Sequence, residues 1–463
     1  MKTRKISALI AAVMIALSAA SCGSTDSGGP AADIPAKPGS AASDIVSETD
    51  PGTTPTPGQT LYPDVEPDTE PEPEPEKPYT EFPSVSDKFV TAANELSVNM
   101  MKLSPLDDLK EGRNALISAE SIMLALGLTA NGSAGETLAQ FEKLLGGGTS
   151  LADLNKDFSA LLETAKSARG IDFSIANSVW SNSDMIKMKQ DFMDMSRSVF
   201  AAESFNAPFD SDTVSKVNDW VSENTHRMIP RIIDRLTPTD VAVLVNCIAF
   251  EADWAEQYED VQVNENGIFT NSKGEEETVP MMSSSEDIYL SGEGAKGFIK
   301  RYKDNRFGFA AILPDEGVSA AEYIGTLTGE KLEAMFKGRS FDTVMVRMPE
   351  FKFDWGSSIA SDLKKLGLTD AFGMSADFSK MAEHDLDGVM RIDDVIHKTH
   401  IENDRSGTKA AAATAVVMKC DGAIMEPEDV KEVFLDRPFV FAIVDMEHNI
   451  PVFLGAVNTV SEQ

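Results

Sequence analysis

The sequence predicts an α+β fold for most of this 463-residue chain. Segments with helical periodicity lie mainly before residue 225, and most strand-like runs follow residue 240. Alternating βαβ units would interleave the two patterns, and no internal repeat at solenoid spacing occurs. A globular composition begins near Ser84 and continues to Gln463, which is long enough for one large domain.

The predicted elements follow from periodicity and residue type. Four segments have apolar residues at helical spacing, namely 88–102, 121–129, 135–145 and 213–224. Ser133 and Glu136 form the pattern of a capping box at the start of the third helix. Eight shorter apolar runs predict strands, namely 173–179, 241–250, 308–313, 343–348, 395–401, 433–435, 439–444 and 452–457.

Residues 1–22 have the pattern of a secretory signal peptide. Three basic residues precede an apolar run from residue 6 to residue 20, which is too short to span a membrane as a mature helix. The small residues before Cys22 resemble the lipobox of bacterial lipoproteins, although Ala19 stands where leucine is more usual. The resemblance implies cleavage before Cys22, a lipid on its sulfur, and a place on the bacterial cell surface or membrane, with release outside the cell as a variant. Ordinary secretion, with Cys22 discarded, is the alternative.

Residues 23–83 predict a disordered, acidic, proline-rich tether. Apolar side chains are too scarce there to offset the entropy lost on ordering. The tether holds thirteen acidic and two basic residues, a net charge of −11, and the signal contributes +3. The whole chain carries −34, so residues 84–463 carry −26. This charge argues against nucleic acid, anionic membranes and heparin as partners, which leaves a lipid anchor as the only expected membrane contact.

Few residues suit catalysis or metal binding. The cysteines Cys22, Cys247 and Cys420 give no disulfide framework, and Cys247 is expected to be buried in an apolar run. None of the five histidines forms a His-Glu-x-x-His motif, and His397 and His400 lie on opposite faces of a predicted strand. We therefore expect no metal site, no cofactor and no enzymatic activity.

Residues 292–297 fit the dinucleotide-binding pattern G-x-G-x-x-G. No long helix follows them, so a hairpin turn is the better interpretation.

Residues 405–419 form the most unusual stretch of the chain. Every second residue from Thr408 to Met418 is uncharged, whereas the other set begins with Lys409 and ends with Lys419. Successive side chains of a strand point to opposite faces, so a strand here would have one uncharged face of small side chains. Alanine is also the best helix former, and the residues alone leave an alanine-rich surface helix equally open.

Several separated segments together resemble the serpin family in order and spacing. The resemblance covers the chain from about Val85 to its end, with Ala119 where the family has a proline. Each block is weakly specific by itself, but their joint order is highly specific. The matching blocks are 114–122, 124–130, 135–137, 218–229, 244–254, 348–352, 377–379, 397–398, 405–419, 437–441 and 453–455.

The resemblance implies a serpin domain over residues 84–463, with three β-sheets, about eight or nine helices and an exposed reactive-centre loop. It also implies a monomeric suicide inhibitor of serine proteases, with cysteine proteases as a further target class. The protease attacks the loop and forms an acyl-enzyme, and the loop then inserts into the central sheet as a new strand. A dozen inserted residues would carry the protease ~40 Å at about 3.3 Å per residue. The alternative is a non-inhibitory binding protein of the same fold that proteases cleave as a substrate.

The site residues implied by the resemblance form two groups. The region where the central strands part comprises Ser118, Ser121, Asn246 and His397, with Trp254 beneath the point where the loop enters. The hinge of the loop consists of small residues, as in inhibitory members, and an uncharged face would enter the dry sheet interior without burying a charge. The hinge residues are Gly407, Thr408, Ala410, Ala411, Ala412, Ala413 and Thr414.

Two charges near the hinge are reversed relative to the family. Arg405 stands where glutamate is usual, and Glu350 stands where the family has the lysine that pairs with it. The sequence therefore predicts the same ion pair with reversed polarity.

Family spacing places the scissile bond between Asp421 and Gly422. The segment that follows is several residues longer than usual, so other positions remain open. These are Met418, Lys419, Ala423 and Met425. An aspartate before the cut would suit an Asp-directed protease and a lysine a trypsin-like one, whereas methionine or alanine would suit chymotrypsin- or elastase-like proteases.

Overall fold

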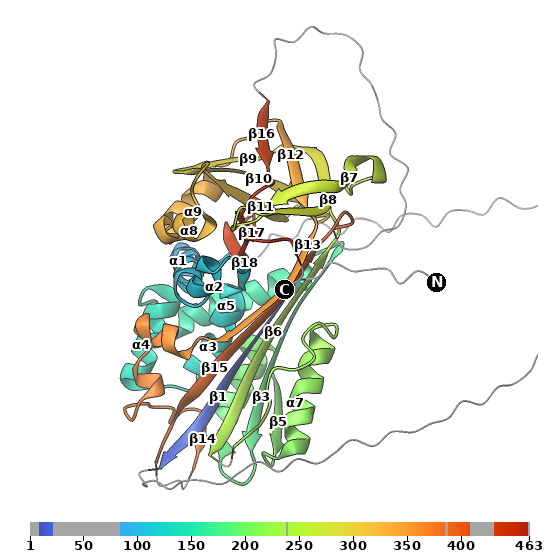
Figure 1. The fold of residues 1–463 in the computed structure, drawn as a ribbon. Coiled ribbons are helices and arrows are strands. Elements are labelled where there is room, and N and C mark those ends of the chain that lie inside the picture. The colour runs from blue at the N-terminus through green and yellow to red at the C-terminus, as the bar shows by residue number, and fades with distance from the viewer. Residues whose placement is uncertain (1–8, 22–83, 238, 385–387, 408–429, 462–463) are drawn as a thin grey trace, which may run out of the picture. The chain divides into compact units, whose positions relative to one another are not determined.

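The structure, a computed structural model, describes residues 9–21, 84–237, 239–384, 388–407 and 430–461. Its strands form three principal β-sheets and one short two-stranded ladder. Figure 1 shows the long strands of one sheet side by side, with helices on both of its faces. The tether, Cys22, Cys420, the hinge from Thr408 to Thr414 and every scissile-bond candidate lie outside the described residues.

The central sheet has six strands in the order β13-β15-β1-β6-β3-β5. All neighbours are antiparallel except β3 and β5. The strands are β13 (Phe351–Ser358), β15 (Gly388–Asn403), β1 (Leu9–Ser21), β6 (Asp240–Ala252), β3 (Ile171–Asn182) and β5 (Glu203–Ala207).

The strand β1 comes from the apolar run that predicts a signal peptide. It lies between β15 and β6 and pairs antiparallel with both, from Leu9 opposite Ile401 to Ser21 opposite Gly388. The run is apolar enough to fit a central strand as well as a secretory signal. Cleavage before Cys22 concerns processing of the chain, and it stays a prediction.

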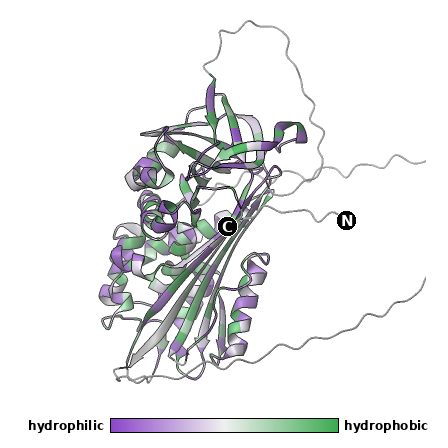
Figure 2. Cartoon of the chain, in the orientation of Figure 1, coloured by the Kyte–Doolittle hydropathy of each residue, from purple (hydrophilic) through white to green (hydrophobic). Residues whose placement is uncertain are grey.

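The strand β6 is apolar in almost every position because both of its faces are covered. Odd-numbered residues from Val243 to Ala249, including the buried Cys247, form a cluster with Trp220 of α7 (Ser211–Asn224). Even-numbered residues belong to the main core, on the side of α3 (Ala119–Ala130). In Figure 2 β6 is mostly hydrophobic, whereas α7 mixes hydrophobic and hydrophilic residues. The alternation of a strand therefore points Asn246 toward α3.

The two other large sheets lie toward one end of the central sheet, and the short two-stranded ladder lies at its other end (Figure 1). The second sheet consists of β2 (Ala115–Ile117), β18 (Ile450–Val457), β17 (Phe439–Asp445), β11 (Phe307–Pro314), β10 (Ala295–Arg301) and β9 (Tyr289–Gly292). The third consists of β16 (Lys431–Phe434), β12 (Val344–Pro349), β8 (Glu276–Glu286) and β7 (Val263–Thr270). The short ladder pairs β14 (Ala382–Glu383) with β4 (Lys187–Met188).

The described residues contain ten α-helices, slightly more than the eight or nine expected. Besides α3 and α7 they are α1 (Asp87–Leu103), α2 (Leu106–Lys110), α4 (Gly135–Gly146), α5 (Leu151–Ser167), α6 (Gln190–Phe200), α8 (Ala320–Thr326), α9 (Gly329–Lys337) and α10 (Ala360–Lys365). Two 3₁₀ helices, η1 (Asp260–Gln262) and η2 (Asp370–Phe372), complete the set.

One local prediction is wrong and one is confirmed. The expected capping box of α4 is absent, because Ala134 is the N-cap and the Ser133 hydroxyl donates instead to the Ala130 carbonyl at 2.7 Å. Residues 292–297 do form a hairpin turn, with Gly294 (φ 74°) between the paired strands β9 and β10.

Candidate functional site: the hinge and the slot of the central sheet

The hinge begins where β15 ends. Asp404 and Gly407 form an antiparallel bridge, and the Gly407 N–H donates to the Asp404 carbonyl at 3.2 Å. Gly407 has φ 68°, and a Cβ there would lie 2.1 Å from the backbone nitrogen of Trp254. Only glycine fits both the backbone conformation and the close approach.

Trp254, which the resemblance places beneath the point where the loop enters, contacts the backbone just before the hinge. Its indole N–H donates to the Asp404 carbonyl at 3.0 Å. The ring is buried and stacks on Tyr302, with ring centroids 4.7 Å apart. Trp254 is therefore both a core residue and a direct contact of the hinge backbone.

Arg405 lies among three carboxylates. Its Nε is 2.8 Å from Glu350, and its Nη1 is 3.0 Å from Glu265 and 3.6 Å from Asp260. Hydrogen bonds that the guanidinium donates to Glu265, and then to Glu350, raise the pKa of Arg405 above its ordinary value, against the opposing effect of burial. The ion pair of reversed polarity is thus present, with side chains 28% and 23% exposed, and it ties the hinge to the start of β13.

We expect Glu350→Lys to lower the free energy of unfolding by about 1 kcal/mol, since a partly exposed attraction becomes a repulsion. The double variant Glu350→Lys/Arg405→Glu should recover part of the loss in a thermal or denaturant double-mutant cycle. Recovery should stay incomplete because Glu265 would then face a glutamate.

Lys352→Glu is a matched control, because Lys352 pairs with Glu402 across the same two strands without touching the hinge. Lys352→Glu should change the free energy of unfolding by the same amount in the wild type and in the Arg405→Glu variant. An unchanged stability in Glu350→Lys, with no further change in the double variant, would contradict the pairing.

The polar residues expected beneath the parting strands form one connected network. The Ser118 N–H donates to His397 Nε2 at 3.1 Å, and the Ser118 hydroxyl accepts from the Ser121 N–H at 3.2 Å as the N-cap of α3. The Ser121 hydroxyl donates to Asn246 Oδ1. All four side chains are fully buried. The network crosses from β15 to β6 by way of α3.

Asn177 extends this network and was missed in the sequence. Its Oδ1 accepts from Asn246 Nδ2 at 2.9 Å, and its Nδ2 donates to the Phe200 carbonyl at 2.8 Å. Asn177 is a polar residue inside the predicted strand 173–179, and such a residue in a buried strand needs a hydrogen-bonding partner. This requirement was the signal in the sequence from which a buried contact of Asn177 could have been predicted.

We use "the slot" for the place of β1 between β15 and β6. Val13 of β1 lies opposite both His397 and Asn246, so the polar network flanks the middle of the slot. The end of the slot nearest the hinge is marked by Leu9, opposite Ile401 and Phe250. A chain that turned back from Gly407 along β15 would run in the same direction as β1.

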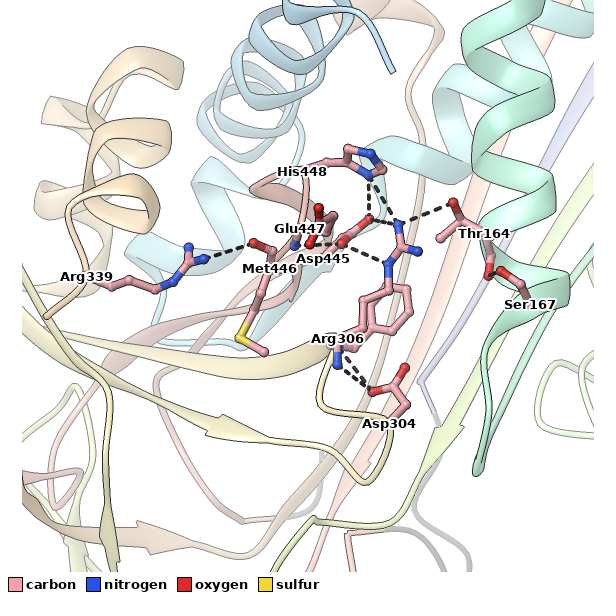
Figure 3. Close-up of polar contacts among 10 residues, drawn as sticks. Thr164, Ser167, Asp304, Arg306, Arg339, Asp445, Met446, Glu447 and His448 are labelled. Atoms are coloured by element: carbon pink, nitrogen blue, oxygen red, sulfur yellow. Dashed lines mark hydrogen bonds and ion pairs between the residues drawn. The ribbon is translucent and has the colours of Figure 1, made fainter. Parts of the chain in front are cut away.

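A second buried polar cluster lies away from the slot, near the turn between β17 and β18 (Figure 3). Arg306 makes two hydrogen bonds to Asp445, at 2.9 and 3.2 Å, and a third to the Thr164 hydroxyl at 3.3 Å. His448 Nδ1 lies 2.9 Å from the same carboxylate. The cluster joins α5, the loop before β11 and the β17–β18 turn, and nothing in the residue pattern predicted it.

Two carboxyl groups of this region have pKa values that are shifted in opposite directions. Burial alone would raise the pKa of Asp445, but hydrogen bonds from His448 and Arg306 hold it below its ordinary value. Burial, with a smaller contribution from the charge of Asp445, raises the pKa of Glu120 to about 8. Glu120 is only 4% exposed, so its ionisation requires burying a charge.

Two further findings concern only the residues that the structure describes. No cluster of three or more His, Cys, Asp or Glu side chains among them could hold a metal ion. No helix among them is long and apolar enough to cross a membrane. His397 and His400 contact different partners, Ser118 and Asp354, on opposite faces of β15.

Comparison with known proteins assigns the fold to a family. A family model described as "Serpin (serine protease inhibitor)" matches residues 91–460, so the chain belongs to the serpin family. Members are in general protease inhibitors rather than enzymes. The α+β serpin fold expected from the sequence is confirmed.

Individual relatives are moderately similar over most of their length. Serpin-Z1A of Triticum aestivum is 30% identical over 361 residues, which cover 74% of this chain and 89% of the relative. Iripin-8 of Ixodes ricinus is 26% identical over 385 residues, 80% and 93% of the two chains. The native-state crystal structure of the thermophilic serpin tengpin has a TM-score of 0.73 at 39% identity, with 81% and 95% covered.

Proposed function

We propose that this serpin inhibits serine proteases as a suicide substrate, by inserting residues after Gly407 into the slot. The observation that carries the proposal is the slot itself. It accepts a strand of thirteen residues, all paired antiparallel with β15 and ten of them also with β6, and the end marked by Leu9 adjoins the hinge at Gly407. A protease held as an acyl-enzyme would be carried along by that insertion.

The pairing of Asp404 with Gly407 suggests a register for the inserted loop. Continued along β15, it would set Ala410 opposite Ile401 and Thr414 opposite His397, where Leu9 and Val13 now lie. Even-numbered loop residues would then face the α3 side of the sheet, and Lys409 would face the other side. This arrangement matches the uncharged parity of the stretch.

The same register supports a cut next to Asp421. Thirteen loop residues, from Ala410 to Gly422, would occupy the length that the thirteen residues of β1 occupy. A cut after Asp421 would release almost the full length of strand that the slot can accept. We propose Asp421 as the residue before the cut for an Asp-directed protease. A trypsin-like protease would cut instead at Lys419, and a chymotrypsin- or elastase-like protease at Met418, Ala423 or Met425.

The setting of this activity is proposed from the N-terminal pattern. Processing before Cys22 and lipidation of its sulfur would attach a monomeric inhibitor to the outer face of a bacterial membrane through residues 23–83. The anionic body supports contact with proteins rather than with polyanions. Mass spectrometry of the N-terminal peptide would detect the lipid as an added mass on Cys22.

The test incubates the processed chain, beginning at Cys22, with elastase, chymotrypsin, trypsin, an Asp-specific protease and a cysteine protease. We expect an adduct that survives denaturing electrophoresis with at least one of them. With the Asp-specific protease, mass spectrometry of the released C-terminal peptide should show Gly422 as its first residue. Cleavage by every protease without an adduct would refute inhibition and leave the non-inhibitory alternative.

A further inference from the structure

We infer that the N-terminal segment Leu9–Ser21 is a competing occupant of the slot, so that a chain which retains it cannot insert its reactive-centre loop. That β1 occupies the slot rests on its pairing with β15 and β6. That it blocks inhibition rests also on the proposed function. Removal of the segment would then be the step that makes the protein an inhibitor.

Backbone pairing is the first argument. All thirteen residues of β1 pair with β15 in one antiparallel ladder, which has a single irregularity between Ala16 and Leu17. On its other side β1 pairs with β6 from Leu9 to Ser18. The flanking strands β15 and β6 have no neighbour in common except β1, so a loop strand could enter between them only after β1 had left.

The side of the slot that faces α7 gives the second argument. Met14 is 4% exposed and lies in one cluster with Val217, Trp220 and Val221 of α7. In the register proposed for the loop, Ala415 would take the place of Met14, since both would lie opposite Ile396. Because alanine is smaller than methionine, the loop strand would leave part of this space empty, and β1 packs better against α7.

The lack of charged residues in β1 and the length of its connection to α1 are also compatible with β1 in the slot. Leu9–Ser21 contains no charged residue, whereas the loop would bring Lys409 and Lys419 to the sheet. The connection from Ser21 to the N-cap Ser86 has more than sixty residues, a reach of roughly 200 Å when extended. A sheet strand of thirteen residues spans only about 43 Å, so the connection puts no strain on β1.

The test uses the full chain, residues 1–463, and a backbone change. Val13→Pro removes an N–H in the middle of a central strand, where both neighbours depend on main-chain hydrogen bonds. Met14→Glu is a second variant that places a charge in the cluster under α7. Val46→Pro, in the predicted tether, is the matched control because it makes the same substitution outside the paired strand.

Two measurements are made on each full-length variant. Hydrogen exchange should show slow amides in residues 9–21 of the wild type and of Val46→Pro, and at least tenfold faster exchange in Val13→Pro and Met14→Glu. Adduct yield with a protease that the processed chain traps should be at least tenfold lower for the wild type and Val46→Pro than for Val13→Pro and Met14→Glu.

Each outcome has a distinct meaning. Fast exchange of residues 9–21 in the wild type, or an adduct yield equal to that of Val13→Pro, would overturn the inference even if inhibition is real. Slow exchange that Val13→Pro abolishes, combined with no adduct from any variant or from the processed chain, would support occupancy by β1. In that case the proposed function, and not the contact, would have failed.

Discussion

Thr408→Arg is expected to convert the processed protein from an inhibitor into a substrate, with at least a tenfold loss of covalent adduct. In the proposed register, Thr408 would insert opposite Asn403, which is buried at the end of β15. An arginine there would have to bury its charge without a partner as the loop begins to enter, and such burial costs several kcal/mol. Insertion would slow, and the protease would complete hydrolysis first.

The measurement is the ratio of adduct to cleaved serpin on denaturing gels, with the protease found in the panel. Lys409→Arg is the matched control, because it places an arginine on the opposite face, where the proposed register sets it against the partly exposed Glu402. Its adduct yield should stay within twofold of the wild type. An unchanged yield in Thr408→Arg would refute insertion of the even-numbered face.

Glu120→Gln is expected to raise the free energy of unfolding at pH 9 by up to about 5 kcal/mol. The pKa of the Glu120 carboxyl rises from 4.5 to about 8 in the folded protein, through burial and the charge of Asp445. The unfolded chain therefore loses this proton near pH 4.5, whereas the folded chain keeps it until about pH 8. Stability falls across that interval, by roughly 1.4 kcal/mol per pH unit, and the full cost is present above pH 8.

Denaturant titrations at pH 4 and pH 9 check this expectation. At pH 4 the wild type and Glu120→Gln should differ little, since the carboxyl is protonated in both states. Glu322→Gln is the control of opposite sign, because hydrogen bonds from Ser319 lower the pKa of that exposed carboxylate. Parallel pH profiles for the wild type and Glu120→Gln would contradict the buried, protonated state of Glu120.

Strands and helices with long, regular patterns were predictable. The runs 241–250 and 439–444 lie within β6 and β17, and the helical segments 88–102 and 213–224 lie within α1 and α7. These segments have an apolar pattern that only one kind of element can bury. The polar network was predicted only through the family resemblance, since Asn246 and His397 are separated by 151 positions and no local pattern joins them.

The sequence misled in places where a partner elsewhere in the fold decides the structure. Ser133 has the residue type of an N-cap, yet its hydroxyl turns back to Ala130, so the capping box never forms. The strand β1 could not be predicted from the run Leu9–Ser21 alone, because its place between β15 and β6 depends on strands far along the chain; the interpretation of this run as a secretory signal stays a prediction. Arg306 and Asp445 lie 139 positions apart, and their buried pairing leaves no trace in either neighbourhood.

Asn246 also fixes the register of β6. If β6 slipped by one residue, every side chain would exchange faces, because the period of a strand is two. Asn246 would then lie among Val217, Trp220 and Val221 without a hydrogen-bonding partner, while an apolar side chain would face Ser121. A buried amide that loses its hydrogen-bonding partners costs about 1–3 kcal/mol for each lost partner. If the proposed exchange of β1 for the loop strand takes place, β6 would keep this single alignment before and after it.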